Sequence, residues 1–210
     1  MFYFFRMELR ERIITEAFEL FVKYGIRSVT MDQVSGELGI SKRTLYETFK
    51  DKGELLREGL DHYAKIHRAE ALEIAEKADN VIQAIYLLTR SGEEMKQRVN
   101  PLFFEDIKKY YRDVHLMLTT DGRYRDHTLT MQLLRKGVRD GLFKKNLNIE
   151  LVNSFFHEIM TLVMNEEVFP EDRFSDEDVF RSIIMPYLVG ICTQKGQEQI
   201  RKYFEKEIKL

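Results

Sequence analysis

This chain of 210 residues contains few residues that turn or cross-link a polypeptide, with 3 Pro, 11 Gly and 1 Cys. Strand-rich folds need many turns, and Gly and Pro are the residues that favour them, so their shortage argues against a sandwich or a barrel. The single Cys192 excludes an internal disulfide framework and a zinc site built from several cysteines. The composition therefore predicts a mainly helical chain without disulfides.

Long apolar runs are also missing. No stretch approaches the roughly 18 residues that a membrane span requires. The apolar start, MFYFFR, is too short for a signal peptide and lacks its leading positive charge. Hydrophobic residues make up 44% and charged residues 32%, as in ordinary globular proteins rather than disordered ones. We expect a soluble cytoplasmic protein that does not use a membrane.

The chain has no surplus of positive charge either. Its 33 Lys and Arg residues are balanced by 35 Asp and Glu, which gives a net charge of −2. This balance argues against non-specific binding of nucleic acid over the whole surface, but it leaves room for a local site. Any DNA-reading element must lie in a short segment.

Apolar residues recur at helical spacing along most of the chain. Between Glu8 and Tyr24 they form one face of an amphipathic helix, which Gly25 ends. Further helix starts are expected at the capping-box patterns Thr30–Gln33 and Asp51–Glu54, and at Ser41, Asp79, Asn100, Asn148 and Ser175. A helix from Tyr124 to Gly137 or Asp140 and one after Gly196 complete the pattern. The sequence thus predicts about nine helices and no credible strand.

The stretch from Val29 to Leu56 carries the most specific pattern. One short helix begins after Thr30 and is stopped by Gly39, and Ser41 caps a second helix two residues later. Two helices joined by a tight, glycine-containing turn make a helix-turn-helix. Leu45 and Phe49, one turn apart, should face inward, so that the Lys, Arg and Tyr between them face out. Such a helix fits the major groove of DNA.

These residues closely resemble the N-terminal domain of the TetR family of bacterial transcriptional regulators. The matching positions are Thr30, Val34, Gly39, Ile40, Ser41, Thr44, Leu45, Tyr46, Phe49, Lys52 and Leu55, and the segment from Ile13 to Gly25 resembles the family's first helix. The departures are Ser35 and Leu38 for alanine, Thr48 for histidine and Lys50 for proline. The resemblance covers residues 10–56. It implies an all-α fold, with a three-helix DNA-binding domain at residues 1–51 and a larger helical effector-binding and dimerisation domain at residues 52–210.

The pattern and the resemblance together predict the DNA contacts. The candidates are Thr30, Ser41, Lys42, Arg43, Thr44, Tyr46, Thr48 and Lys52. The resemblance implies that the Tyr46 hydroxyl reaches a phosphate, and that Lys52, a cation against a helix N-terminus, clamps another. Alternatives stay open: Arg43 could pair with Glu47 one turn later, and Tyr46 could pack against the fold. Glu47 could accept a hydrogen bond from a cytosine amino group or be a plain exposed acid.

The longer C-terminal part shows no motif for catalysis. It lacks nucleotide-binding loops and hydrolase or zinc-protease signatures, and the five histidines share no metal-ligand spacing. We therefore predict no enzyme, no metal and no cofactor. Aromatic and Met residues on its central helices fit a core, and several together would line a pocket for a small apolar effector. The candidates are Phe103, Tyr110, Met131, Phe156 and Met160.

The segment Ile149–Phe169 is apolar almost all round, which requires burial on two sides. The chain's own helices can cover one side, and we expect a partner subunit to cover the other. The resemblance implies that this segment forms a four-helix dimer interface with Asp176–Thr193, in which Pro186 should kink the helix. Cys192 should be a buried small hydrophobe.

A homodimer would bind a near-palindromic operator in double-stranded DNA. The predicted function is a sequence-specific transcriptional regulator, a repressor that a small-molecule effector releases from DNA. The alternative is an all-α enzyme or small-molecule carrier in which the helix-turn-helix is only structural.

Overall fold

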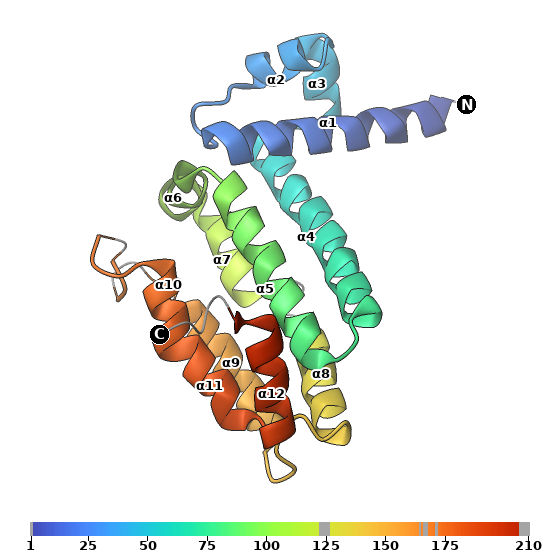
Figure 1. Cartoon of the computed structure of the whole chain (residues 1–210). Coiled ribbons are helices and arrows are strands. Elements are labelled where there is room, and N and C mark those ends of the chain that lie inside the picture. Colours follow the sequence, from blue (N-terminus) through green and yellow to red (C-terminus); the bar gives the residue numbers. More distant parts are fainter. Residues whose placement is uncertain (1, 122–126, 164, 166–167, 171, 206–210) are drawn as a thin grey trace. The chain divides into compact units, whose positions relative to one another are not determined.

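The computed structural model describes residues 2–121, 127–163, 165, 168–170 and 172–205. Throughout these ranges the regular structure is helical, and the one strand-like pairing is an isolated bridge between Phe143 and Cys192. The all-α prediction is confirmed (Figure 1). None of the described helices has the length and apolar character to cross a membrane.

The helices follow one another with short connections. In chain order they are α1 (Phe2–Tyr24), α2 (Met31–Glu37), α3 (Lys42–Thr48), α4 (Lys52–Lys77), α5 (Val81–Arg98), α6 (Pro101–Tyr110), α7 (Arg112–Thr120), α8 (Thr128–Arg139), α9 (Ile149–Val163), α10 (Asp176–Val179), the π-helical η1 (Phe180–Ile184), α11 (Met185–Ile191) and α12 (Gln194–Tyr203). They divide into two compact units. The first holds Met1–Ala71 and Ser91–Arg125, and the second holds Leu72–Arg90 and Asp126–Leu210.

The start of the first unit folds as its local signals predict. Gly25 and Gly39 adopt φ values of +82° and +64°. This left-handed conformation, which glycine adopts without strain, ends α1 and α2. The complete capping box of Thr30 and Gln33 opens α2, and Ser41 caps α3. Both predicted helix starts and the turn between them are confirmed.

The predicted capping box at the start of α4 is half right. The amide of Glu54 donates to Asp51 Oδ1 at 2.8 Å, which is the expected N-cap bond. The Glu54 carboxylate, however, accepts from the amide of Lys50 at 2.6 Å rather than from that of Asp51. The Glu54 side chain therefore bonds to the residue before the N-cap, and this contact stabilises the connection between α3 and α4.

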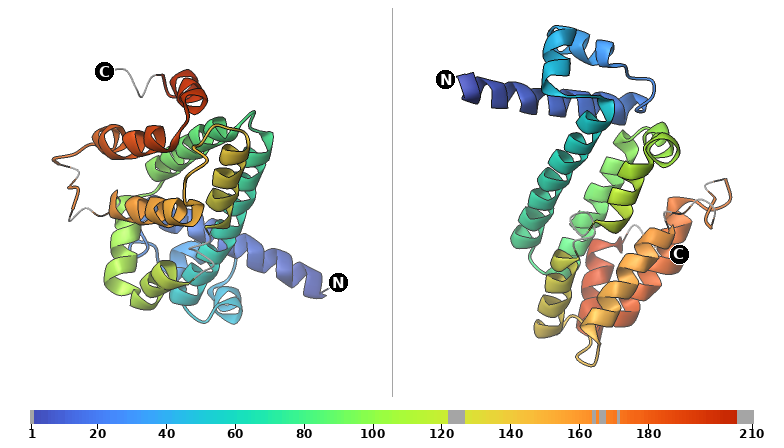
Figure 2. Two further views of the ribbon diagram at one scale, coloured as in Figure 1. Left: turned by 90° about the horizontal axis from the view of Figure 1, so that it is seen from below. Right: turned by 180° about the vertical axis from the view of Figure 1, so that it is seen from behind.

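One hydrophobic core joins the three N-terminal helices to α4, α6 and α7. Figure 2 shows α2 and α3 gathered on one side of α1. Buried side chains from α1, α2, α3 and α4 meet others from α6 and α7, including Phe18, Phe21, Leu45, Phe49, Leu56, Phe103, Ile107 and Val114. Phe18 lies edge-on to Phe103, with ring centroids 5.7 Å apart. The helix-turn-helix thus shares its core with helices from beyond residue 100.

The second unit has its own core, formed by α8, α9, η1, α11, α12 and the adjoining parts of α4 and α5, around Ile82, Phe143, Ile200 and Phe204. Helices α9 and α11 run side by side (Figures 1 and 2), and the Tyr187 hydroxyl donates to the carbonyl of Val152 at 2.7 Å. The expected disturbance at Pro186 takes the form of the π-helical segment η1. There the amide of Met185 reaches back five residues to the carbonyl of Phe180.

Several predicted boundaries were wrong. Helix α9 ends at Val163 rather than near Phe169, and α12 begins at Gln194 rather than after Gly196, because Thr193 caps it. The backbone turns at Tyr111, which separates α6 from α7 and helps to make the helices more numerous than expected. Helix α8 starts at Thr128, and the predicted start at Tyr124 lies outside the described residues.

Candidate nucleic-acid interface

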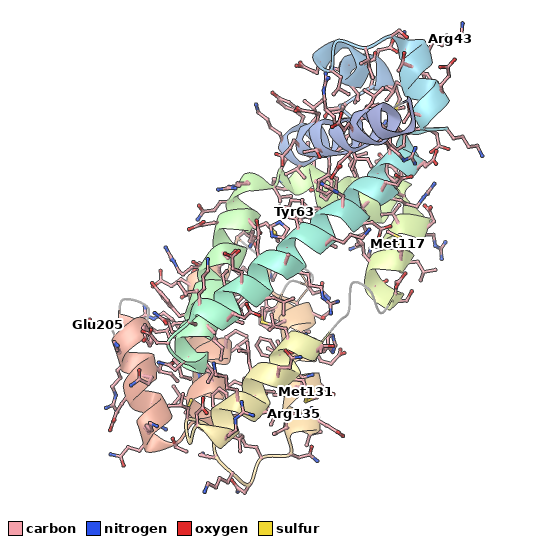
Figure 3. All side chains as sticks on the ribbon, turned by 90° about the vertical axis from the view of Figure 1, so that its right-hand side faces the viewer. Arg43, Tyr63, Met117, Met131, Arg135 and Glu205 are labelled. Carbon is pink, nitrogen blue, oxygen red and sulfur yellow. The ribbon has the colours of Figure 1, made fainter. Side chains whose placement is uncertain are left out.

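Helix α3 presents its polar side chains because its apolar ones are completely buried. Leu45 and Phe49 are inaccessible to solvent, whereas Lys42 and Arg43 are exposed and Tyr46 keeps 52% of its surface open. Figure 3 shows Arg43 on the outer side of this helix. The inward and outward faces are those that the sequence predicted.

The hydroxyl groups among the candidates cap the two short helices. Thr30 Oγ1 accepts from the amide of Gln33 at 3.2 Å, and Ser41 Oγ accepts from the amide of Thr44 at 3.1 Å. The Ser41 and Thr44 hydroxyls also share a hydrogen bond of 2.8 Å. These residues fix the helix starts and lie at or near the surface, where helix N-terminal amides and dipoles favour phosphate groups.

The two cations at the start of α3 already have acidic neighbours. Lys42 forms an ion pair with Asp32 of α2. Arg43 Nε donates to Glu47 Oε1 at 2.7 Å, and this contact raises the pKa of Arg43. The pairing that the sequence left as an alternative is therefore present in the free protein. Both pairs are exposed, where ion pairs contribute little to stability and can exchange partners.

The C-terminal end of α3 is fastened to α1 by a residue that sequence reasoning missed. Arg10 donates to the carbonyl of Thr48 at 2.7 Å, forms an ion pair with Glu58 and lies over the Phe49 ring at 4.3 Å. The Thr48 hydroxyl is turned back to the carbonyl of Thr44 at 2.8 Å. Thr48 therefore lies at a point where α3 is held by its own hydrogen bonds.

Lys52 is partly buried and bonded to the protein itself. Its Nζ donates to the carbonyls of Ile26 and Val29 at 2.8 and 2.9 Å. Burial lowers the pKa of Lys52, and the nearby Asp106 carboxylate opposes that shift. Two of its three N–H donors thus hold the loop between α1 and α2. Sequence reasoning noticed the misplaced cation, but it could not see these carbonyls more than 20 residues away.

The five candidates for effector binding fall into two groups. Phe103 and Tyr110 belong to α6 in the first unit, whereas Met131, Phe156 and Met160 belong to α8 and α9 in the second unit. Phe103 is a buried core residue beside Phe18, and the Tyr110 hydroxyl accepts from Arg27 at 2.7 Å. The other three are half-buried, and Figure 3 shows Met131 on α8.

A polar cluster between α8 and α9 was not predicted. Thr130 Oγ1 donates to Asn153 Oδ1 at 2.6 Å and lies 2.7 Å from His157 Nε2. The rings of His127 and His157 stack with centroids 3.4 Å apart. The one available signal was Asn153, a polar residue in an apolar helix, which proves to be buried. No group of three or more His, Cys, Asp or Glu side chains in the described chain could hold a metal ion.

Helix α9 leaves part of its apolar surface uncovered. Leu151, Phe155 and Leu162 are 68%, 53% and 46% exposed, although α8 and α11 pack against other faces of the helix. Among the described residues of α9, Asn153 is the buried one. As predicted, the chain's own helices cover one side of this segment, and the other side remains open to another molecule.

Comparisons with known proteins agree with this geometry. A family model described as "Bacterial regulatory proteins, tetR family" matches residues 13–58, the segment from α1 into α4. The HTH-type transcriptional repressor KstR2 of Mycolicibacterium smegmatis is 23% identical over 192 residues, which cover 90% of this chain and 93% of the repressor.

Solved structures show the same fold over most of the chain. A putative TetR-family transcriptional regulator from Mesorhizobium loti has a TM-score of 0.64 at 19% identity, covering 90% of this chain and 98% of that one. A gamma-butyrolactone receptor (an ArpA-like protein) has a TM-score of 0.61 at 17% identity, covering 96% and 97%. Both halves of the chain therefore take part in the likeness.

Proposed function

Because this chain belongs to the tetR family of bacterial regulatory proteins through its N-terminal domain, we propose that it is a repressor released from its operator by a small molecule. The chain is a DNA-binding transcriptional regulator. The observation that carries the proposal is α3 itself, a capped helix with a buried apolar ridge and an exposed polar N-terminal end. Residues 1–51 would read DNA, and residues 52–210 would bind the effector and the partner subunit.

On DNA, the exposed cations of α3 would exchange their acidic partners for the nucleic acid. Arg43 would leave Glu47 for a base edge, where a bidentate contact to guanine is the commonest specific one. Lys42 and the exposed Tyr46 would contact phosphates, and so would the third N–H of Lys52. Thr30, Ser41, Thr44 and Thr48 would set the helix ends close to the backbone of the duplex.

The exposed apolar face of α9 supports a homodimer. A second copy of the same face would cover Leu151, Phe155 and Leu162, and the neighbouring α11 would complete a four-helix interface. Two recognition helices could then enter successive major grooves, which makes the operator a near-palindrome.

The effector would be small and mainly apolar. Met131, Phe156 and Met160 are the half-buried candidates for its site, because pliable Met and flat aromatic rings line such sites well. Phe103 and Tyr110 are better explained by the packing of α6. The names of two similar proteins support a ligand-responsive regulator, since one is a repressor and the other a receptor for gamma-butyrolactones.

DNA selection tests the proposal directly. The full-length protein is incubated with a random duplex library, and the bound sequences are amplified and aligned. We expect a near-palindromic motif whose affinity, followed by fluorescence anisotropy, falls steeply with salt concentration. If the recovered duplexes share no common motif, the protein is not a sequence-specific regulator, and the carrier or enzyme alternative is favoured. A thermal-shift screen then supplies an effector, which should weaken binding to the selected duplex.

A further inference from the structure

The loop between α1 and α2 is held by two groups of opposite charge. Asp106, on α6, is a buried carboxylate with 8% of its surface exposed, and its Oδ2 accepts from the backbone amide of Arg27 at 2.7 Å. From α4, Lys52 donates to the carbonyls of Ile26 and Val29 at either side of that amide. A carboxylate thus accepts a hydrogen bond from an N–H of the loop, while an ammonium donates hydrogen bonds to two of its C=O groups.

Close packing leaves the loop little freedom. A Cβ atom added at Gly25 would lie 3.0 Å from Leu102 Cβ and 3.5 Å from Asp106 Oδ2. Ile26 and Val29 are buried on either side of the exposed Arg27. The start of α6 is thus in direct contact with the loop.

The side chain of Arg27 adds a second attachment to the same helix. Its guanidinium donates to the Tyr110 hydroxyl at 2.7 Å and lies over the Tyr110 ring at 4.3 Å. Tyr110 follows Asp106 by four residues, so both groups project from one face of α6. One face of α6 therefore binds both the backbone amide and the side chain of Arg27.

The loop leads directly into the helix-turn-helix. Thr30 caps α2, and Met31, the first residue of α2, is buried in the shared core. Helix α2 in turn contacts α3 through the ion pair of Asp32 with Lys42. The position of the loop therefore sets where α2 begins, and α2 supports the recognition helix.

We propose that Asp106 is a positioning residue for DNA recognition, which together with Lys52 fixes the α1–α2 loop and so orients α3. This inference rests on the proposed function, because it assigns a task within DNA binding. Asp106 touches no nucleotide in this proposal. Its carboxylate holds a backbone amide that would otherwise lack a partner in a tightly packed site.

Three variants separate the hydrogen bond from the charge and from general damage. Asp106→Ala removes both, whereas Asp106→Asn keeps a side-chain oxygen that can accept from the Arg27 amide. Glu105→Ala is the matched control, because it removes an exposed carboxylate from the adjacent position of α6. The selected operator duplex and a random duplex are both titrated, and the melting temperature of each variant is recorded.

We expect Asp106→Ala to lower affinity for the operator about tenfold or more while affinity for random DNA changes less than twofold, since a tilted recognition helix still meets phosphates. Asp106→Asn should retain operator binding within about threefold of the unmodified protein, and Glu105→Ala should match it. An equal loss of operator and random binding by Asp106→Ala, or no loss at all, would overturn the proposal. A failure of Asp106→Asn to bind the operator would also overturn it, even where Asp106→Ala does not fold.

Hydrogen exchange separates this inference from the proposed function. The Arg27 amide should be protected in the unmodified protein and exchange at least tenfold faster in Asp106→Ala, with no DNA present. Unprotected exchange of that amide in the unmodified protein would contradict the assigned contact. If the selection yields no operator, the proposed function is contradicted. The hydrogen-exchange result then still decides whether Asp106 holds the Arg27 amide.

Discussion

Arg43 and Glu47 face each other across one turn of α3, with Arg43 Nε 2.7 Å from Glu47 Oε1. Both side chains are exposed, so water screens their attraction and the pair is easily opened. Arg43 must leave this partner before it can contact a base. In the proposed complex Glu47 would therefore compete weakly with DNA for the arginine.

Replacing the competitor should strengthen binding slightly. Glu47→Gln removes an exposed ion pair, which water already weakens, and a negative charge from the face of α3 that would lie near the phosphates. We expect a two- to fivefold gain in operator affinity, measured by fluorescence anisotropy at fixed salt.

Arg43→Ala is the counterpart and should lose about 1–3 kcal/mol of operator-binding free energy, with preference relaxed at one base position. Unchanged affinity and preference in Arg43→Ala would leave Arg43 as a partner of Glu47 alone.

Lys52 should matter for stability as well as for DNA. Lys52→Ala removes the two hydrogen bonds to Ile26 and Val29, and a bond to a charged group contributes about 1.5–3 kcal/mol. We expect a lower urea midpoint, together with a salt slope reduced by about one unit per half-site if the third N–H reaches a phosphate. Lys50→Ala, which removes an exposed lysine two residues earlier, is the control. A stability equal to that of the control would contradict the role in the loop.

Assembly should depend on the open face of α9. Phe155→Glu places a charge on an apolar surface that is exposed in one chain, so it should break the dimer without unfolding the protomer. Leu87→Glu makes the same kind of change at an exposed apolar position of α5 and should leave the dimer intact. Sedimentation velocity at micromolar concentration distinguishes the two. A monomeric unmodified protein would remove the basis for a two-fold operator.

Cys192 should be unreactive and should make stability depend on alkaline pH. Burial raises the pKa of the Cys192 thiol to about 12 from an ordinary 9.0, so the folded state favours the protonated form. That contribution is fully present below pH 9 and is lost as pH rises towards 12. Burial raises the pKa of Tyr187 to about 12 as well, which acts in the same direction from about pH 10 upwards. Urea midpoints should fall above pH 9, less steeply in Cys192→Ala, and a thiol reagent should not modify the folded protein at pH 8.

Two helical glycines should respond oppositely to alanine. In Gly59→Ala the new Cβ would lie 2.5 Å from Phe18 Cδ2, inside the core of the first unit, and such overpacking costs about 1–3 kcal/mol. Gly92 has nothing within 4 Å of that position, so Gly92→Ala should stabilise α5 by roughly 0.5–1 kcal/mol. Thermal melts measure both. Equal shifts would show that the close contact of Gly59 with Phe18 does not exist.

The helix-turn-helix could be read from the sequence because its determinants are local. Thr30 bonds to Gln33, Ser41 bonds to Thr44, and Gly39 needs only its own backbone angle. Each signal lies within four residues of the group it acts on, so spacing alone identifies it.

Contacts between distant segments could not be predicted in this way. Lys52 reaches carbonyls 26 and 23 residues away, and Asp106 meets an amide 79 residues away. The sequence marked Lys52 only as a cation placed against a helix N-terminus, and nothing in the spacing of charges distinguished Asp106 from an ordinary surface residue. Asn153 stood out as a polar residue in an apolar helix, but its partner Thr130 became known only from the packing of α8 against α9. Effector residues were hardest to predict, because an aromatic side chain suits a core and a binding site equally well.

The shared core of the first unit has a consequence for exchanging parts between regulators. A chimaera joined after residue 51 would carry Phe18, Phe21 and Phe49 to a new host but leave Phe103 and Ile107 behind. The transplanted DNA-binding segment would then pack against the host's α6, whose surface differs. A graft of residues 1–60 together with residues 101–120 would keep the α1–α4 and α6–α7 side chains of that core together. We therefore expect the transferable unit of this chain to be discontinuous in sequence, because residues 1–51 depend for packing on α4, α6 and α7.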